Sequence, residues 1–111
     1  DAVVAIHGEG SSEIAVFLGG KDNDLGTKLK TALERHGDTV KTHRNPMLQG
    51  LASTNICNRG RLSAGVQLEL SFGLRLTFFQ SLTTEGRKKP TEELFRFATA
   101  VREGLRDAGR L

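Results

Sequence analysis

The sequence predicts an α/β domain in which a mixed sheet is flanked by helices. Short apolar runs of strand length lie at residues 3–6 and 14–18, and residues 65–71 alternate between apolar and polar side chains. Two other stretches repeat apolar side chains at helical spacing. Because strands and helices interleave along the chain, we expect a single domain over residues 1–111.

The first two apolar runs predict the first two strands. Residues 3–6 are continuously apolar, a pattern typical of a strand covered on both faces, and the run ends at His7 and Gly8. Residues 14–18 form a similar run, which two glycines close. The chain begins at Asp1 and enters a strand almost at once, as expected at an interior boundary of a longer protein.

A helix is expected next, with Asp22 or Asp24 as its N-cap and Gly37 just beyond its end. Its apolar positions have helical spacing: Leu25, Leu29, Ala32, Leu33 and His36. Residues 39–42 predict a modest strand that stops before Pro46.

Residues 44–64 show no period and predict a long connection, of the kind that is usually functional or disordered. Residues 65–71 then predict a strand with Gln67, Glu69 and Ser71 on a face exposed to water. Residues 74–82 are ambiguous and suit a short helix. A last helix follows Pro90, with apolar positions at Leu94, Ala98, Val101, Leu105 and Ala108.

The composition limits the function classes. Hydrophobic residues make up 37% of the 111, and the net charge of +3 favours an acidic partner, either a polyanionic peptide, nucleic acid or anionic lipid. The longest apolar run is too short to cross a bilayer, so we expect a soluble chain without a membrane partner. The single cysteine, Cys57, cannot form an internal disulfide, which leaves the compartment open; we interpret it as structural.

The three histidines differ as candidate metal ligands. A catalytic zinc site needs about three protein ligands and an open position, and neither a His-Glu-x-x-His helix nor a paired cysteine motif occurs. His36, on the apolar face of its helix, suits a packed or end-of-helix role, and His43 suits a surface position. His7 ends a strand beside Gly8, where α/β sheets gather ligands, so both a site role and an ordinary strand-end role remain open.

Glu69 is a candidate general base, because burial would raise its pKa toward the range useful for proton transfer. The alternative is a carboxylate on the solvated face of an edge strand. In the long connection, Asn58 and Arg59 offer amide and guanidinium donors that suit an anionic substrate, and the alternative there is a basic surface loop.

Four segments together resemble a known family. They are Ile6-His7-Gly8, residues 16–20, residues 55–59 and residues 65–71, and their order and spacing are similar to those of the poly-γ-glutamate hydrolases, many of them phage-encoded. The resemblance implies a zinc-dependent peptidase with a carboxypeptidase-like fold, which cuts γ-glutamyl linkages in poly-γ-glutamate or another γ-glutamyl peptide.

The resemblance also implies roles for individual residues. His7 matches a zinc ligand, and Glu69 matches the carboxylate that activates the zinc-bound water; from their chemistry, Asn58 and Arg59 would face substrate carboxylates. The family's first His and Glu ligands have no counterpart, so we expect a chain that lacks the N-terminal part of the fold and holds an incomplete zinc site. Glu9 and Glu13 are possible substitutes.

Two other functions stay in view. One is a non-catalytic module that binds an acidic polymer through Arg59, Arg61 and the basic turn at residues 87–89. The other is nucleic-acid binding, which ranks last because the basic residues are spread along the chain without a recognition motif.

Overall fold

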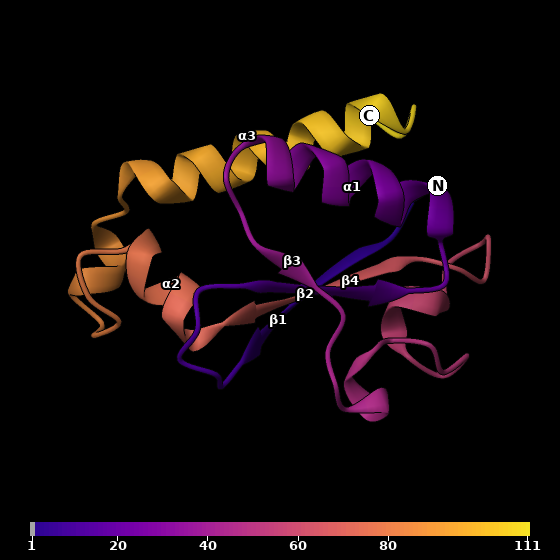
Figure 1. Ribbon diagram of the computed structural model, residues 1–111, viewed down its shortest axis with the longest axis horizontal. Coiled ribbons are helices and arrows are strands. Elements are labelled where there is room, and N and C mark those ends of the chain that lie inside the picture. The colour runs from indigo at the N-terminus through magenta and orange to yellow at the C-terminus, as the bar shows by residue number, and fades with distance from the viewer. Residues whose placement is uncertain (1) are drawn as a thin grey trace.

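The computed structural model describes residues 2–111, which form a four-stranded mixed sheet with two long helices over one face (Figure 1). The strands are β1 (Val4–Glu9), β2 (Val16–Gly20), β3 (Val40–Lys41) and β4 (Val66–Ser71), in the order β1-β4-β2-β3. β4 pairs in parallel with β1 and antiparallel with β2, and β3 is parallel to β2. The predicted α/β class with a mixed sheet is confirmed.

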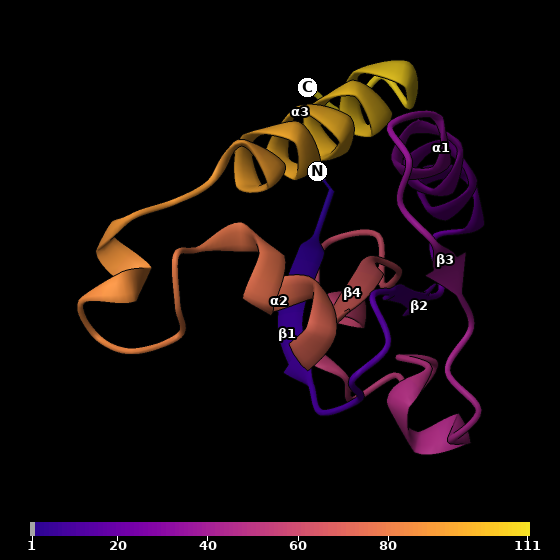
Figure 2. The same ribbon diagram turned by 60° about the vertical axis from the view of Figure 1, so that its left-hand side comes forward.

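The two long helices, α1 (Asn23–Arg35) and α3 (Glu92–Asp107), lie side by side above the sheet (Figures 1 and 2). The Asp22 side chain caps α1 by accepting a hydrogen bond from the backbone N–H of Leu25, as one of the two predicted caps would. Gly37 follows the C-cap His36, and its φ of +96° suits a residue without a Cβ. Local sequence signals therefore set both ends of α1.

The core lies between these helices and the sheet. It is made of apolar side chains from α1, β2, β4 and α3, among them Leu29, Leu33, Val16, Leu68 and Phe97. On α3 the buried positions are Phe97, Ala100 and Gly104. Four of the five predicted apolar positions are partly buried against this core, and Ala98 alone among the five is exposed; the four are Leu94, Val101, Leu105 and Ala108. Gly104 lets the helices approach closely, because a Cβ there would lie 2.7 Å from a methyl group of Leu29.

The polar row on β4 is buried, not exposed to water as predicted. Gln67, Glu69 and Ser71 are 2%, 5% and 0% exposed, because β4 is a central strand and the connection after β3 covers the sheet face away from the helices. That connection contains the short 3₁₀ turns η1 (Pro46–Leu48) and η2 (Ile56–Asn58), and it lies below the sheet in Figure 1.

The first strand also differs from its prediction. β1 continues beyond the apolar run to Glu9, and within residues 2–111 it pairs only with β4, so it is an edge strand. Ile6 is 55% exposed, which contradicts the predicted cover on both faces. An apolar run indicates that a strand can be buried, but it does not show whether another element of the chain covers that strand.

The short helix α2 (Phe72–Phe78) follows β4 directly; it begins two residues before the segment 74–82 that suited a short helix and ends within it. A basic turn, η3 (Gly86–Lys88), then leads to α3. No helix among residues 2–111 is both long enough and apolar enough to cross a membrane.

Candidate functional site

His7 and Glu69 face each other on the sheet. They are Cα partners in the parallel pairing of β1 with β4, and His7 Nδ1 lies 3.4 Å from Glu69 Oε1. Both side chains project from the face opposite to the core residue Leu68, because neighbouring residues in a strand point to opposite faces. Glu69 is buried while 42% of the His7 side chain is accessible, so the pair is open to a ligand from the His7 side.

Strand register extends this pair into a row across the whole sheet. Phe17 of β2 pairs with Glu69 on one side and with Lys41 of β3 on the other. Because paired residues share a face, His7, Glu69, Phe17 and Lys41 form one continuous row on the polar side of the sheet. We refer to these four residues as the cross-strand row.

A second His–Glu pair lies next to the row. Glu9 follows His7 by two residues on β1 and so lies on the same face, and its Oε2 is 3.0 Å from His43 Nε2. His43 Nδ1 accepts a hydrogen bond from the backbone N–H of Asn45, and the imidazole packs edge-on against Phe17 with ring centroids 4.8 Å apart. The prediction that His43 is a surface residue is wrong, since only 16% of its side chain is accessible.

The Glu9 carboxylate is held as an anion by its neighbours. Burial by itself would raise the pKa of Glu9, but hydrogen bonds from the Ser11 hydroxyl and backbone N–H and from His43 outweigh that effect and lower the pKa. Glu9 therefore has its charge balanced by Ser11 and His43, which leaves it little capacity for another ligand.

These residues border a pocket of about 360 Å³. Its lining comes from β1, the β1–β2 loop, β2 and the end of β3, namely Glu9, Ser11, Glu13, Phe17, Lys41, Thr42, His43 and Arg44. Phe17 and Lys41 belong both to the pocket and to the cross-strand row, so the pocket opens beside the His7–Glu69 pair.

Arg75 of α2 fixes the ends of the two strands that carry the pair. Its Nε donates to the Leu70 carbonyl oxygen at 3.2 Å, and its Nη2 donates to the Glu9 carbonyl oxygen at 3.0 Å. The guanidinium also lies over the Phe72 ring, 5.8 Å from the centroid. Sequence reasoning missed Arg75, although a cation within a short, otherwise apolar helix was a usable signal.

The donor atoms present do not form a zinc site by themselves. Within residues 2–111 there is no group of three or more His, Cys, Asp or Glu residues placed to hold a metal ion. The predicted substitutes are engaged elsewhere, Glu9 with His43 and Ser11, and Glu13 with Lys41 at 2.6 Å. The site offers one imidazole and one carboxylate, where a catalytic zinc ion usually has three protein ligands.

Asn58 and Arg59 lie away from this pair. Asn58 is 3% exposed, and its side-chain amide makes hydrogen bonds only to backbone atoms, so its placement supports a structural role instead of the predicted substrate contact. Arg59 is exposed, and its neighbour Gly60 lies against Val3, since a Cβ on Gly60 would be 2.7 Å from the Val3 side chain. Val3 precedes His7 by four residues of extended chain, or about 13 Å, so this loop is distant from the His7–Glu69 pair.

Two further residues have structural roles, as predicted. Cys57 is buried and its pKa is raised by that burial, which disfavours a reactive thiolate. His36 ends α1 and its Nε2 lies 2.8 Å from Glu103 Oε2 of α3.

Residues 1–100 match the sequence profile of a family described as poly-gamma-glutamate hydrolase, which confirms the resemblance seen in the motifs. Two curated relatives come from Bacillus subtilis (strain 168). The SPbeta prophage-derived UPF0714 protein YoqZ is 28% identical over 96 residues, and the UPF0714 protein YmaC is 30% identical over 102 residues.

Solved structures share the fold. A bacteriophage poly-gamma-glutamate hydrolase matches with a TM-score of 0.88 at 26% identity, over 94% of this chain and 51% of that one. A zinc-free apo form of YndL matches with a TM-score of 0.87 at 21% identity, over 96% and 54% of the two chains. The curated matches cover 86% and 90% of this chain but 35% and 43% of YoqZ and YmaC, so the chain spans about half or less of the length of each protein.

Proposed function

Because the chain belongs to the poly-gamma-glutamate hydrolase family, we propose that it contributes to the hydrolysis of γ-glutamyl linkages, with poly-γ-glutamate or another γ-glutamyl peptide as substrate. The observation that carries this proposal is the pairing of an accessible His7 with a buried Glu69 at 3.4 Å, beside a pocket whose lining includes the cations Lys41 and Arg44.

Glu69 has the proton-transfer role. Its carboxylate accepts a proton from the attacking water as the water oxygen bonds to the scissile carbonyl carbon, and it returns that proton to the amine nitrogen as the C–N bond breaks. Phe17 pairs with Glu69 on the same face of the sheet and is 7% exposed, so it shields the carboxylate from bulk water on this side.

His7 is proposed as one ligand of a zinc ion. When bound, such an ion supplies Lewis-acid polarisation of the carbonyl and lowers the pKa of a bound water molecule. The remaining ligands must be donors other than those that residues 2–111 bring together at this pair. Arg75 acts as a positioning residue, because it holds the carboxyl ends of β1 and β4 in register.

Arg59 is proposed to contact a carboxylate farther along the polymer. It is exposed on the loop after η2, at the opposite end of β1 from Glu9, where a long substrate lying over the polar face would pass. Asn58 contributes by fixing this loop through its backbone hydrogen bonds.

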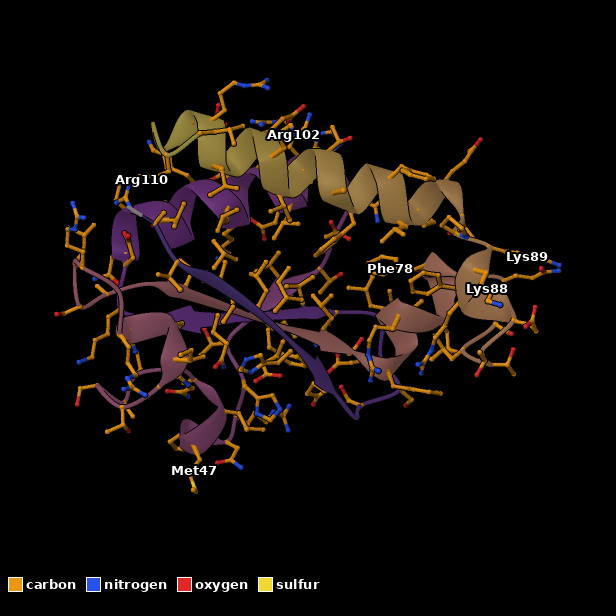
Figure 3. The ribbon with its side chains drawn as sticks, turned by 180° about the vertical axis from the view of Figure 1, so that it is seen from behind. Met47, Phe78, Lys88, Lys89, Arg102 and Arg110 are labelled. Carbon is orange, nitrogen blue, oxygen red and sulfur yellow. The ribbon has the colours of Figure 1, made fainter. Side chains whose placement is uncertain are left out.

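A second candidate is a non-catalytic module that binds an acidic polymer. The site offers a single imidazole to a metal, which favours this candidate. So do the exposed cations Lys88, at the end of η3, and Lys89, which follows it; both project outward at one end of the molecule (Figure 3). This candidate requires salt-sensitive polymer binding that needs no metal.

The two candidates are separated by zinc titration and a γ-glutamyl hydrolysis assay on this chain joined to a segment that supplies the remaining zinc ligands, in the wild-type form and as His7→Ala and Glu69→Gln. In that protein we expect zinc-dependent turnover, weaker zinc binding in His7→Ala, and a decrease of about 100-fold or more in kcat in Glu69→Gln with zinc binding retained. Polymer binding without zinc and without turnover there would exclude the hydrolase and support the module.

A further inference from the structure

The pocket beside the cross-strand row contains two cations that a substrate anion can reach. Lys41 extends from the row itself, and Arg44 follows β3 three residues later; both are exposed and both line the pocket. Among residues 2–111, Arg44 has no ion-pair partner. Lys41 is paired with Glu13, but about half of each side chain is accessible, so this exposed pair contributes little and can give way to another carboxylate.

The acidic wall of the pocket does not oppose an incoming anion strongly. Glu9 receives hydrogen bonds from Ser11, and its other oxygen lies 3.0 Å from His43 Nε2, so local donors already stabilise its carboxylate, while Glu13 points to Lys41. His43 is itself held by Asn45 and Phe17, so the Glu9 side of the pocket is rigid.

The spacing of the row suits a γ-glutamyl unit. In such a unit the scissile carbonyl carbon and the carbon of the α-carboxylate are four bonds apart, or about 5 Å when extended. Glu69 and Lys41 are separated by two strand spacings, about 10 Å between Cα atoms, and the Lys41 side chain is long enough to span the remainder. The Phe17 ring lies between these two residues in the row, so the methylene carbons of the glutamyl unit would pack over it.

We propose that this pocket is the subsite for the α-carboxylate of the glutamyl unit whose carbonyl is attacked, with Arg44 and Lys41 as its binding residues. The assignment rests on the proposed function, because it places the scissile carbonyl at Glu69. It makes Arg44 and Lys41 determinants of specificity for an acidic acyl unit, while Phe17 contacts the aliphatic part of the same unit.

The test measures binding of a γ-linked glutamate pentamer by isothermal titration calorimetry, with the same pentamer carrying α-carboxamides as the uncharged ligand. We expect Arg44→Gln to weaken binding of the acid pentamer about tenfold and Lys41→Gln to weaken it by a smaller factor. Arg102→Gln on α3 is the matched control, since it removes one exposed guanidinium outside the pocket, and binding should stay within about twofold of wild type.

Equal effects of Arg44→Gln and Arg102→Gln would overturn the proposal, and so would binding of the carboxamide pentamer as tight as that of the acid pentamer. Tight binding of a single-stranded oligonucleotide with the same Arg44 dependence would also overturn it, by showing a general polyanion surface. Turnover by the wild-type chain, with a KM that Arg44→Gln does not change, would reject the subsite assignment but not the proposed hydrolase function. Pentamer binding that depends on Arg44, in the absence of turnover, would reject the hydrolase function but not the subsite assignment.

Discussion

A single buried amide holds much of the long connection in place. The side chain of Asn58 donates to the carbonyl oxygens of Gly50 and Ala52 at 2.6 and 3.0 Å, and its oxygen accepts from the backbone N–H groups of Gly65 and Lys21. These contacts join the connection to the start of β4 and to the end of β2. The loop is therefore anchored from within, although it contains little regular structure.

Replacing Asn58 by alanine should lower the free energy of unfolding by about 2–3 kcal/mol, because it leaves buried backbone groups of Gly50 and Gly65 without partners. Urea denaturation followed by circular dichroism measures this change. Arg59→Ala, at the exposed neighbouring position, should stay within about 0.5 kcal/mol. A similar, small effect at both positions would contradict the role assigned to Asn58.

Single residues also show where sequence reasoning stops. His7 and Glu69 were identifiable from their motifs, but their contact depends on the register between β1 and β4, which cannot be predicted from either strand's sequence alone. The pair of Glu9 and His43 was missed because it joins two segments far apart in the chain, and neither residue lies in a pattern that requires a partner.

At the scale of elements, local signals predicted α1 and the existence of α3, since caps, glycines and helical spacing act within a few residues. Burial of the strands was not predictable in the same way. The polar row of β4 looked solvated, yet the strand lies between β1 and β2 and beneath the connection after β3. Strand order is a property of the whole fold. The alternation of apolar and polar residues in β4 therefore shows which residues share a face of the sheet, but not which element covers that face.

The packing of α1 against α3 includes a polar contact that depends on pH. Hydrogen bonds from His36 and then from Arg35 hold the pKa of Glu103 below its ordinary value. A carboxyl group whose pKa is lowered in the folded state stabilises the protein above its unfolded pKa, and this contribution is lost as the pH falls through the folded pKa.

We therefore expect Glu103→Gln to reduce the dependence of Tm on pH in the acidic range, measured by thermal unfolding from about pH 7 to about pH 3. Glu92→Gln is the control, because it removes a carboxyl group from the same helix at a position with no ion pair in the described part of the chain. A Glu103→Gln profile that runs parallel to the wild-type profile would show that the α1–α3 contact does not contribute.

For the molecule as a whole, the open edge of β1 is the feature with the widest consequence. Within residues 2–111 no strand pairs with its outer side, and Ile6 is 55% exposed beside it. Unpaired backbone groups next to an apolar side chain favour pairing with another chain. We expect this polypeptide in isolation to self-associate through β1.

Sedimentation velocity over a range of protein concentrations measures that association. Ile6→Lys should shift the distribution toward monomer, since a charge on an edge strand opposes pairing. Met47→Lys is a matched control, because Met47 is 88% exposed and projects from η1, away from the helices (Figure 3). A strictly monomeric wild-type chain, or equal effects of the two substitutions, would contradict the prediction.

The central position of β4 also constrains how the chain reaches its fold. β1 and β2 come first in the sequence but do not pair with each other; each pairs with β4, so that Val4 meets Val66 and Val16 meets Leu70. Closing such distant contacts costs chain entropy before any pairing energy is gained. The helix α1 can form early from its own signals, but the sheet has to wait for its last strand to be synthesised, and folding is therefore expected to be slow and to begin only after β4 has emerged from the ribosome.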